Sequence, residues 1–294
     1  MTSMRSTRAR VAVAAAGAGL LAVLTPGSSV AAIAPDLGAA STSRSPAAAP
    51  ARTLPPVNAT ADYQLGGTYP PARGVAIVTR DMTDAPPKGV YAICYVNAFQ
   101  TQPELRRWWL TKHPTLILRD ARGRVVTDPG WPGEMLLDTS TAAKRASLAS
   151  IIGVWFARCR AVGYRAVEPD NLHSWTRSTR RLTLRQNAAY AALLSARAHA
   201  LGLAIAQKND TDMLALRSTT RFDFAVTEEC QAYAECAAYT RVYGRHVIEI
   251  EYSENGGRAG FAKACAARGS SISIVYRDRN LVPRGTRGHV YAAC

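Results

Sequence analysis

The chain has 294 residues, 48% of them hydrophobic, and a formal net charge of +15. Residues 58–294, which have the composition of a folded domain, keep 31 Lys and Arg against 20 Asp and Glu. The basic residues are scattered and no helix-turn-helix or RNA-binding signature occurs, so we expect no nucleic-acid partner.

Residues 1–34 have the pattern of a secretory signal peptide. Arg5, Arg8 and Arg10 precede an apolar run over residues 11–24, and small residues follow at 29–34. The run is shorter than the roughly 20 residues that a membrane-spanning helix needs, and no later segment approaches that length. We therefore expect a secreted, extracellular protein with no membrane attachment after cleavage. An uncleaved signal anchor is the alternative.

Residues 35–57 are mostly Ala, Ser, Pro and Thr, with almost no large apolar side chain. Such a segment cannot bury enough surface to offset its ordering entropy, so it is predicted to be a flexible linker. Residues 58–294 are predicted to form a single domain, whose length is close to that of one α/β barrel, and a monomer is expected.

From residue 75 onward, short β-branched or apolar segments alternate with longer helical ones, as in a parallel sheet with crossover helices. The predicted strands cover residues 75–79, 90–96, 115–118, 166–170, 203–208, 222–227, 247–252 and 271–276. Their number is the one that closure of a (β/α)₈ TIM barrel requires. Residues 115–118 fit least well, because they run into a turn-like segment that a hairpin would also contain. No Gly-x-Gly-x-x-Gly follows the first strand, which disfavours a dinucleotide-binding sheet.

Three helices are predicted with their ends. They cover residues 139–162, 184–201 and 259–268, and each is followed by a glycine, Gly163, Gly202 and Gly269. A glycine at this position supplies the left-handed residue that ends many helices.

All six cysteines lie in the folded part, and export would bring them to an oxidising compartment where disulfides persist. Six cysteines allow too many pairings for the sequence alone to select one. Cys230 and Cys236 are close enough for a local pair, and Cys265 with Cys294 would fasten the C-terminus, which leaves Cys94 with Cys159. The spacings match no zinc pattern, so no metal site is expected.

The acidic residues gather where four predicted strands end. Residues 168–171 read Glu-Pro-Asp-Asn, 207–210 Gln-Lys-Asn-Asp, 227–230 Thr-Glu-Glu-Cys and 249–254 Glu-Ile-Glu-Tyr-Ser-Glu. Catalytic residues of TIM barrels lie at these carboxyl ends. A single acid there could instead cap the next helix, but a cap needs only one side chain per helix. Acids at four consecutive strand ends therefore favour an active site.

Residues two apart on a strand face the same side, so Glu168 should lie beside Asp170, and Glu249 beside Glu251. Carboxylates that converge repel one another, and one can then keep its proton while another stays ionised. Glycoside hydrolysis needs such a pair, one acid to protonate the leaving oxygen and one carboxylate to attack or to activate water.

Lys208 is interpreted as an ion-pair partner that keeps a carboxylate charged, with a role as substrate ligand as the alternative. Aromatic rings at strand ends and loops, above all Trp131 and Tyr252, could cover the apolar faces of sugar rings. For Trp131, in the rigid sequence Gly-Trp-Pro-Gly, a packed surface turn is an equal alternative.

Six short motifs in order resemble those of glycoside hydrolase family 114, the endo-α-1,4-polygalactosaminidase group. They lie at residues 93–96, 131–134 with 137–138, 163–164 leading to 167–171, 207–210, 226–230 and 251–252. The resemblance implies a TIM barrel that cleaves galactosamine-containing polysaccharide internally without a cofactor. It implies a catalytic pair of Asp170, as nucleophile or charge stabiliser, and Glu228, as acid/base.

Further positions are expected to bind substrate: Tyr95, Trp131, Glu168, Asn171, Lys208, Asn209, Asp210, Glu229, Glu251 and Tyr252. The sequence departs from the family in reading Thr227-Glu228-Glu229 where Asn-Glu-Gln is usual. The extra carboxylate leaves open whether Glu228 or Glu229 faces the site.

A mouth lined by Glu168, Asp170, Asp210, Glu228 and Glu251 is expected to attract cationic galactosamine even on a basic protein, because the local field outweighs net charge at a cleft. Two alternatives remain open. One is a secreted glycan-binding barrel without turnover, and the other is a barrel glycosidase of different α-glycan specificity.

Overall fold

The computed structural model describes residues 51–294. The predicted signal peptide and residues 35–50 of the predicted linker lie outside the described residues. Residues 51–57 form no helix or strand, but they lie against the domain. Pro55 is buried, and the Tyr91 hydroxyl donates a hydrogen bond to the Thr53 carbonyl at 2.5 Å.

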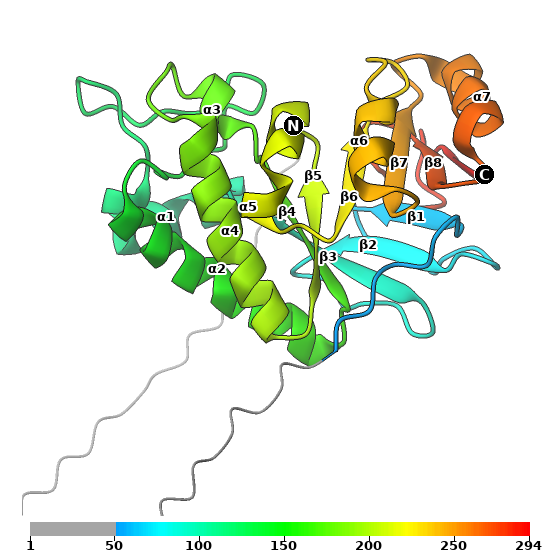
Figure 1. Cartoon of the computed structure of the whole chain (residues 1–294), viewed down its shortest axis with the longest axis horizontal. Coiled ribbons are helices and arrows are strands. Elements are labelled where there is room, and N and C mark those ends of the chain that lie inside the picture. Colours follow the sequence, from blue (N-terminus) through cyan, green and yellow to red (C-terminus); the bar gives the residue numbers. More distant parts are fainter. Residues whose placement is uncertain (1–50) are drawn as a thin grey trace, which may run out of the picture. The chain divides into compact units, whose positions relative to one another are not determined.

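Eight parallel strands follow one another in sequence order, and a ninth pairs antiparallel with the eighth (Figure 1). They are β1 (Ala61–Gln64), β2 (Ile77–Asp81), β3 (Tyr91–Asn97), β4 (Ala166–Asp170), β5 (Ala204–Lys208), β6 (Phe224–Glu228), β7 (Val247–Tyr252), β8 (Ser273–Arg277) and β9 (Tyr291–Ala293). The predicted TIM barrel is confirmed in this nearly closed form.

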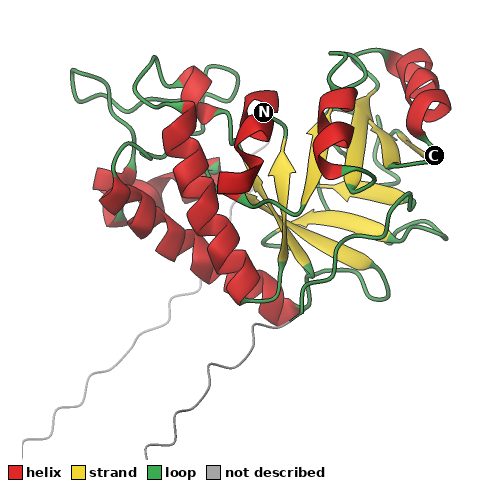
Figure 2. Cartoon of the chain, viewed as in Figure 1, coloured by secondary structure: helices red, strands yellow, loops and turns green. Residues whose placement is uncertain are grey.

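Helices follow β3 to β7 and lie outside the strands (Figure 2). They are α1 (Arg106–Lys112), α2 (Ala142–Val162), α3 (Ser174–Arg177), α4 (Leu184–Ala200), α5 (Arg217–Thr220), α6 (Cys236–Tyr243) and α7 (Gly257–Arg268), with 3₁₀ turns at Pro103–Leu105, Pro114–Leu116 and Thr211–Leu216. Loops without a helix connect β1 to β2 and β2 to β3, so the barrel departs there from a strict (β/α)₈ repeat.

One predicted barrel strand is wrong, and two real strands were missed, β1 and the short antiparallel β9. Residues 115–118 belong to a 3₁₀ turn and to the loop excursion between α1 and α2, where Ile117 forms an isolated bridge with Leu137. The missing barrel strand is β1, whose Asp62 and Gln64 break any apolar pattern. Both can be buried because other polar side chains form hydrogen bonds with them. A search for hydrophobic periodicity cannot detect a strand of this kind.

The barrel seam between β8 and β1 is held by polar contacts. Arg277 of β8 is fully buried, lies 3.1 Å from Asp62 of β1 and donates to the Tyr63 carbonyl. The Ala59 amide also donates to the Ser273 hydroxyl at 3.0 Å. A buried ion pair with further hydrogen bonds thus replaces the strand ladder at this seam.

Side chains alternate between two cores, because successive strand residues face opposite sides. On β6, Phe224 and Val226 lie in the barrel interior, whereas Ala225 belongs to the core between strands and helices. The same parity places Glu228 inside. It places Glu249 and Glu251 of β7 on the outer side, since Ile248 and Ile250 belong to the inner core.

Two of the three predicted helix ends have the expected glycine conformation. Gly163 has φ 112° after α2, and Gly202 has φ 70° after α4. Gly269 is different, with φ −60°, so the prediction of a left-handed residue is wrong there. Glycine is required at this position for space, since an added Cβ would lie 2.6 Å from the Cys265 carbonyl oxygen.

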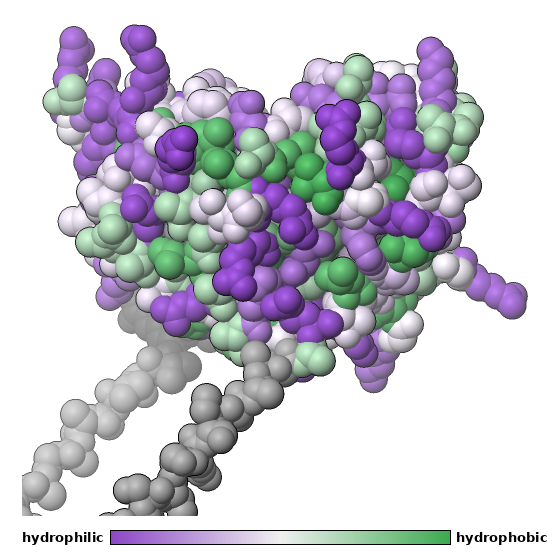
Figure 3. Space-filling view, viewed as in Figure 1, coloured by the Kyte–Doolittle hydropathy of each residue, from purple (hydrophilic) through white to green (hydrophobic). Residues whose placement is uncertain are grey.

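The three disulfides join the pairs that the sequence singled out. Cys94–Cys159 links β3 to α2, Cys230–Cys236 closes the loop before α6, and Cys265–Cys294 ties the C-terminus to α7. No helix among residues 51–294 combines the length and apolarity that crossing a membrane requires. On the face shown in Figure 3, hydrophilic side chains are spread widely, with small hydrophobic patches between them.

Candidate active site

A pocket of about 700 Å³ opens at the carboxyl ends of the parallel strands. Six strands contribute side chains to it, namely Asp81 from β2, Tyr95 from β3, Asp170 from β4, Lys208 from β5, Glu228 from β6 and Tyr252 from β7. This is the end of the barrel at which the active sites of TIM-barrel enzymes lie.

Asp170, the last residue of β4, is held ionised. Its Oδ2 accepts a hydrogen bond from the Tyr95 hydroxyl at 2.7 Å, and its Oδ1 accepts one from the Asn171 amide at 2.7 Å. Burial raises the pKa of Asp170, but the Lys208 ammonium and these hydrogen bonds outweigh burial, so the pKa lies below its usual value.

Lys208 is buried at the floor of the pocket, among carboxylates. Its Nζ donates to Glu168 Oε1 at 2.9 Å and to the Tyr63 hydroxyl at 2.7 Å, and lies 3.4 Å from Glu228 Oε2. Burial lowers the pKa of Lys208, but the surrounding carboxylates, Asp170 first among them, raise it well above its usual value. The lysine therefore stays charged and acts as an ion-pair partner, the interpretation that the sequence favoured.

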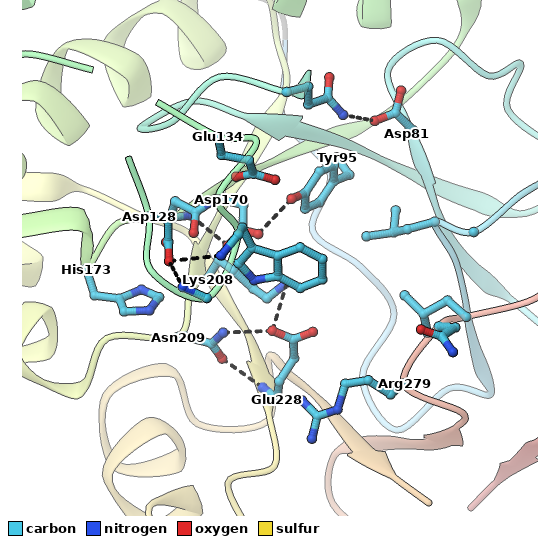
Figure 4. A pocket seen from close by; sticks show the side chains of 18 of the residues that line it. Asp81, Tyr95, Asp128, Glu134, Asp170, His173, Lys208, Asn209, Glu228 and Arg279 are labelled. Carbon is cyan, nitrogen blue, oxygen red and sulfur yellow. Dashed lines mark hydrogen bonds and ion pairs between the residues drawn. The ribbon is translucent and has the colours of Figure 1, made fainter. Parts of the chain in front are cut away.

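Glu228, the last residue of β6, is held on both oxygens. The Tyr252 hydroxyl donates to Oε1 at 2.5 Å. The Asn209 side-chain amide donates to Oε2 at 2.9 Å (Figure 4). Asn209 also accepts from the Glu228 backbone N–H at 2.8 Å. The side chain remains 26% exposed, so the held carboxylate can still meet a ligand in the pocket.

The structure distinguishes the two neighbouring glutamates. Glu228 has the inward parity of β6 and lines the pocket. Glu229 follows the strand end with φ 59°, does not line the pocket, and forms a salt bridge with Arg279. The glutamate that faces the pocket is therefore Glu228.

A loop between α1 and α2 supplies pocket residues that strand-end reasoning missed. Asp128 Oδ1 accepts from the Gly130 amide at 2.8 Å and the Trp131 amide at 3.3 Å, while its Oδ2 lies 2.6 Å from Arg177 Nε. Asp128 thus holds the turn that presents Trp131, which is 64% exposed and lines the pocket. The Trp-Pro-Gly-Glu motif was the signal for this loop.

Glu134 ends that turn and also lines the pocket. Its Oε2 accepts a hydrogen bond from Asn97 Nδ2 at 2.8 Å. Burial, followed by the negative charges of Asp170 and Asp128, raises its pKa to about 7, against the opposing Asn97 hydrogen bond. Asn97 also accepts from the Asn171 side chain at 2.9 Å, which links Glu134 to the segment that follows Asp170.

Eight of the predicted site residues meet in the pocket: Tyr95, Trp131, Asp170, Asn171, Lys208, Asn209, Glu228 and Tyr252. Four do not line it. Glu168 is fully buried beneath Lys208, and Glu229 binds Arg279. Asp210 accepts from the Trp175 indole at 3.3 Å, and Glu251 faces outward and accepts from the Gln231 amide at 2.9 Å.

The mouth is acidic, but its residues differ from those expected. In place of Glu168, Asp210 and Glu251, the pocket contains Asp81, Asp128 and Glu134. Asp81 lies just beyond a predicted strand, and the other two lie in the α1–α2 loop excursion, of which only residues 115–118 were mistaken for a strand. The remaining polar residues of the lining, which the sequence did not single out, are Gln102, His173, Arg177, Arg279 and Asn280.

Four groups that could ligate a metal ion meet outside the barrel: Cys230, Cys236, Glu249 and Glu251. The two cysteines are joined in a disulfide and offer no thiolate, and Glu249 pairs with Arg268 at 2.8 Å. This set of donors does not fit a metal site.

A barrel with two held carboxylates at strand ends of one pocket has the machinery of a glycoside hydrolase. The sequence model of glycoside-hydrolase family GH114 matches residues 41–294. The chain belongs to this family.

Solved structures agree in fold. Ega3 of Aspergillus fumigatus, in a complex with galactosamine, superposes with a TM-score of 0.67 at 22% identity, covering 83% of this chain and 98% of that one. The glycoside hydrolase domain of PelA from Pseudomonas aeruginosa gives a TM-score of 0.55 at 15% identity, covering 77% and 97%. The comparison with curated protein sequences gave no match.

Proposed function

We propose that this glycoside hydrolase is secreted and cleaves α-1,4-linked galactosamine-containing polysaccharide internally, with Asp170 and Glu228 as the catalytic pair. The observation that carries the proposal is that these two carboxylates, at the ends of β4 and β6, line one pocket of a GH114 chain. The intact pair favours an enzyme over a glycan-binding barrel, because binding alone does not need both.

The two carboxylates have different surroundings, which supports different roles. Asp170 has a lowered pKa and stays ionised, as a nucleophile or a stabiliser of positive charge at the anomeric carbon must. Glu228 is partly exposed in the pocket, and Tyr252 and Asn209 fix its position, so it can reach the leaving oxygen as an acid/base must.

The charge of the pocket supports an amino sugar as substrate. Asp81, Asp128, Glu134, Asp170 and Glu228 line it, and one of the pocket cations, Lys208, is already bound between carboxylates. Galactosamine without its acetyl group is cationic near neutral pH, so such a pocket would attract it. The similarity to a protein crystallised with galactosamine supports the same class.

Two observations support secretion. The signal-like pattern of residues 1–34 precedes the domain, and all six cysteines form disulfides, which persist in oxidising compartments.

The proposal is tested by incubating the protein with partly de-N-acetylated α-1,4-polygalactosamine and measuring new reducing ends. Internal cleavage predicts a rapid fall in polymer size with mixed oligosaccharides as early products, whereas release of monosaccharide alone would contradict it. Binding of the polymer without new reducing ends would favour the glycan-binding alternative.

The catalytic pair is tested by Asp170→Asn and Glu228→Gln. Each is expected to lower kcat by roughly 10³-fold or more, because loss of a nucleophile or general acid removes a transition-state interaction. Glu104→Gln changes an exposed glutamate outside the pocket and is the control. Near-normal activity of Asp170→Asn, with circular dichroism unchanged, would contradict the assignment.

A further inference from the structure

Glu134 is a carboxylate of the pocket that forms no salt bridge with any Lys, Arg or His among residues 51–294. Its Oε2 is fixed by Asn97, but no hydrogen bond among residues 51–294 reaches its Oε1, and no salt bridge involves it. By contrast, Asp128 lies 2.6 Å from Arg177. The fixed carboxylate therefore presents one oxygen to whatever occupies the pocket.

Its surroundings place this oxygen near the proposed reaction centre. Asn97 and Asp170 are register partners on β3 and β4, and Asn97 binds both Glu134 and Asn171. The carboxylates of Glu134 and Asp170 both point into the pocket (Figure 4). In a sugar whose anomeric carbon meets Asp170, the C2 substituent is attached to the next ring carbon, and Glu134 is linked to the Asp170 segment through Asn97.

Glu134 also belongs to the turn that carries the exposed Trp131. The Glu134 amide donates to the Trp131 carbonyl at 2.8 Å, and the Asp128 amide donates to the Glu134 carbonyl at 3.0 Å. One rigid turn therefore offers an aromatic face and a carboxylate. An amino sugar matches this pair, since it has apolar C–H faces and a cationic group.

We propose that Glu134 binds the C2 ammonium of the galactosamine unit at Asp170 and thereby selects the de-N-acetylated sugar over N-acetylgalactosamine. This inference rests on the proposed function. An N-acetyl group is neutral and offers no charge-assisted hydrogen bond to the carboxylate. Glu134 is thus a specificity-determining residue, separate from the two catalytic carboxylates.

The surroundings of Glu134 predict how pH affects this contact. Burial, followed by the negative charges of Asp170 and Asp128, raises its pKa to about 7, while the Asn97 hydrogen bond and the Arg177 charge oppose this shift. Galactosamine binding should strengthen as pH rises through about 7, because the carboxylate becomes ionised, until the sugar amine loses its own proton. Galactose binding should not show this dependence.

The test measures dissociation constants of galactosamine, N-acetylgalactosamine and galactose by calorimetry, for wild type and Glu134→Gln between pH 5 and 8. The variant keeps an oxygen for Asn97, so the fold should persist. We expect galactosamine affinity at the upper end of this range to fall roughly 10- to 100-fold, the range for a hydrogen bond to a charged group, with galactose unchanged. The pH dependence of galactosamine binding should disappear. Glu104→Gln should match wild type.

Polymer cleavage separates the two proposals. If wild type releases no reducing ends from any galactosamine polymer, the proposed function fails whatever Glu134 does. If wild type cleaves the polymer but prefers galactosamine no more than galactose, or if Glu134→Gln keeps the preference and its pH dependence, the role of Glu134 is overturned.

Discussion

The charge of Asp170 depends on one buried ammonium, that of Lys208, which also contacts Glu168 and Glu228. Such a cluster of buried charges contributes little to the stability of the fold, because removing each charge from water is costly. Its role is to set the electrostatics of the pocket. A fixed positive charge at the pocket floor keeps a carboxylate ionised in surroundings that would otherwise favour its protonated form.

Lys208→Met tests this role. Removing the cation should raise the pKa of Asp170, so the acid limb of the pH profile of kcat/KM should move to higher pH. The variant leaves Glu168 buried without its partner and should lose about 3–5 kcal/mol of unfolding free energy. Adding Glu168→Gln should recover part of that stability, measured by urea unfolding, without recovering activity. An unchanged acid limb would contradict the electrostatic role.

Among the elements, the loop excursion between α1 and α2 matters most for the pocket, since it carries Asp128, Trp131 and Glu134. Its isolated bridges, such as Thr127 with Met135, and the hydrogen bonds to Asp128 give it a fixed shape without a long strand or helix. A rigid loop of this kind can present an aromatic ring to a polymer at low entropic cost.

Trp131→Ala should therefore weaken polymer binding rather than chemistry. We expect KM for polygalactosamine to rise roughly 3- to 10-fold, from about 0.5–1.5 kcal/mol of lost ring contact, with little change in kcat. Because the ring is 64% exposed, the melting temperature should hardly change. Tyr233→Ala is the matched control, an exposed aromatic outside the pocket, and an equal effect of both variants would argue against a sugar-binding role for Trp131.

At the scale of the whole molecule, three disulfides constrain the barrel over very different loop lengths. The paired cysteines are 65, 6 and 29 residues apart for Cys94–Cys159, Cys230–Cys236 and Cys265–Cys294. In the chain-entropy model, a longer closed loop removes more entropy from the unfolded chain.

Replacing each cysteine pair by alanines should rank the three bridges. The expected losses of unfolding free energy are about 4.3 kcal/mol for Cys94–Cys159, about 2.2 kcal/mol for Cys230–Cys236 and about 3.6 kcal/mol for Cys265–Cys294. Urea unfolding of the three double variants measures this. A smaller loss for the pair 94 and 159 than for the pair 230 and 236 would show that native-state contacts, and not loop length, control the effect.

The strand periodicity predicted most of the barrel, because apolar and β-branched runs between glycine-ended helices depend on local chemistry. It failed at β1, where Asp62 and Gln64 are buried by partners far away in the chain, among them Arg277. It failed again at residues 115–118, where three apolar residues pack in a loop excursion. Burial of polar residues by distant partners cannot be read from a local pattern.

The sequence by itself determined the fold class and a set of strand-end motifs with Asp170 and Glu228 among them. It singled out three cysteine pairs, but the structure established the disulfides. Only the tertiary structure decided which acids share the pocket. Strand parity turns Glu228 inward and Glu251 outward, Lys208 lies over the buried Glu168, and the α1–α2 loop brings in Glu134. The physical reason is that side-chain type is local, whereas convergence depends on register, parity and loop path together.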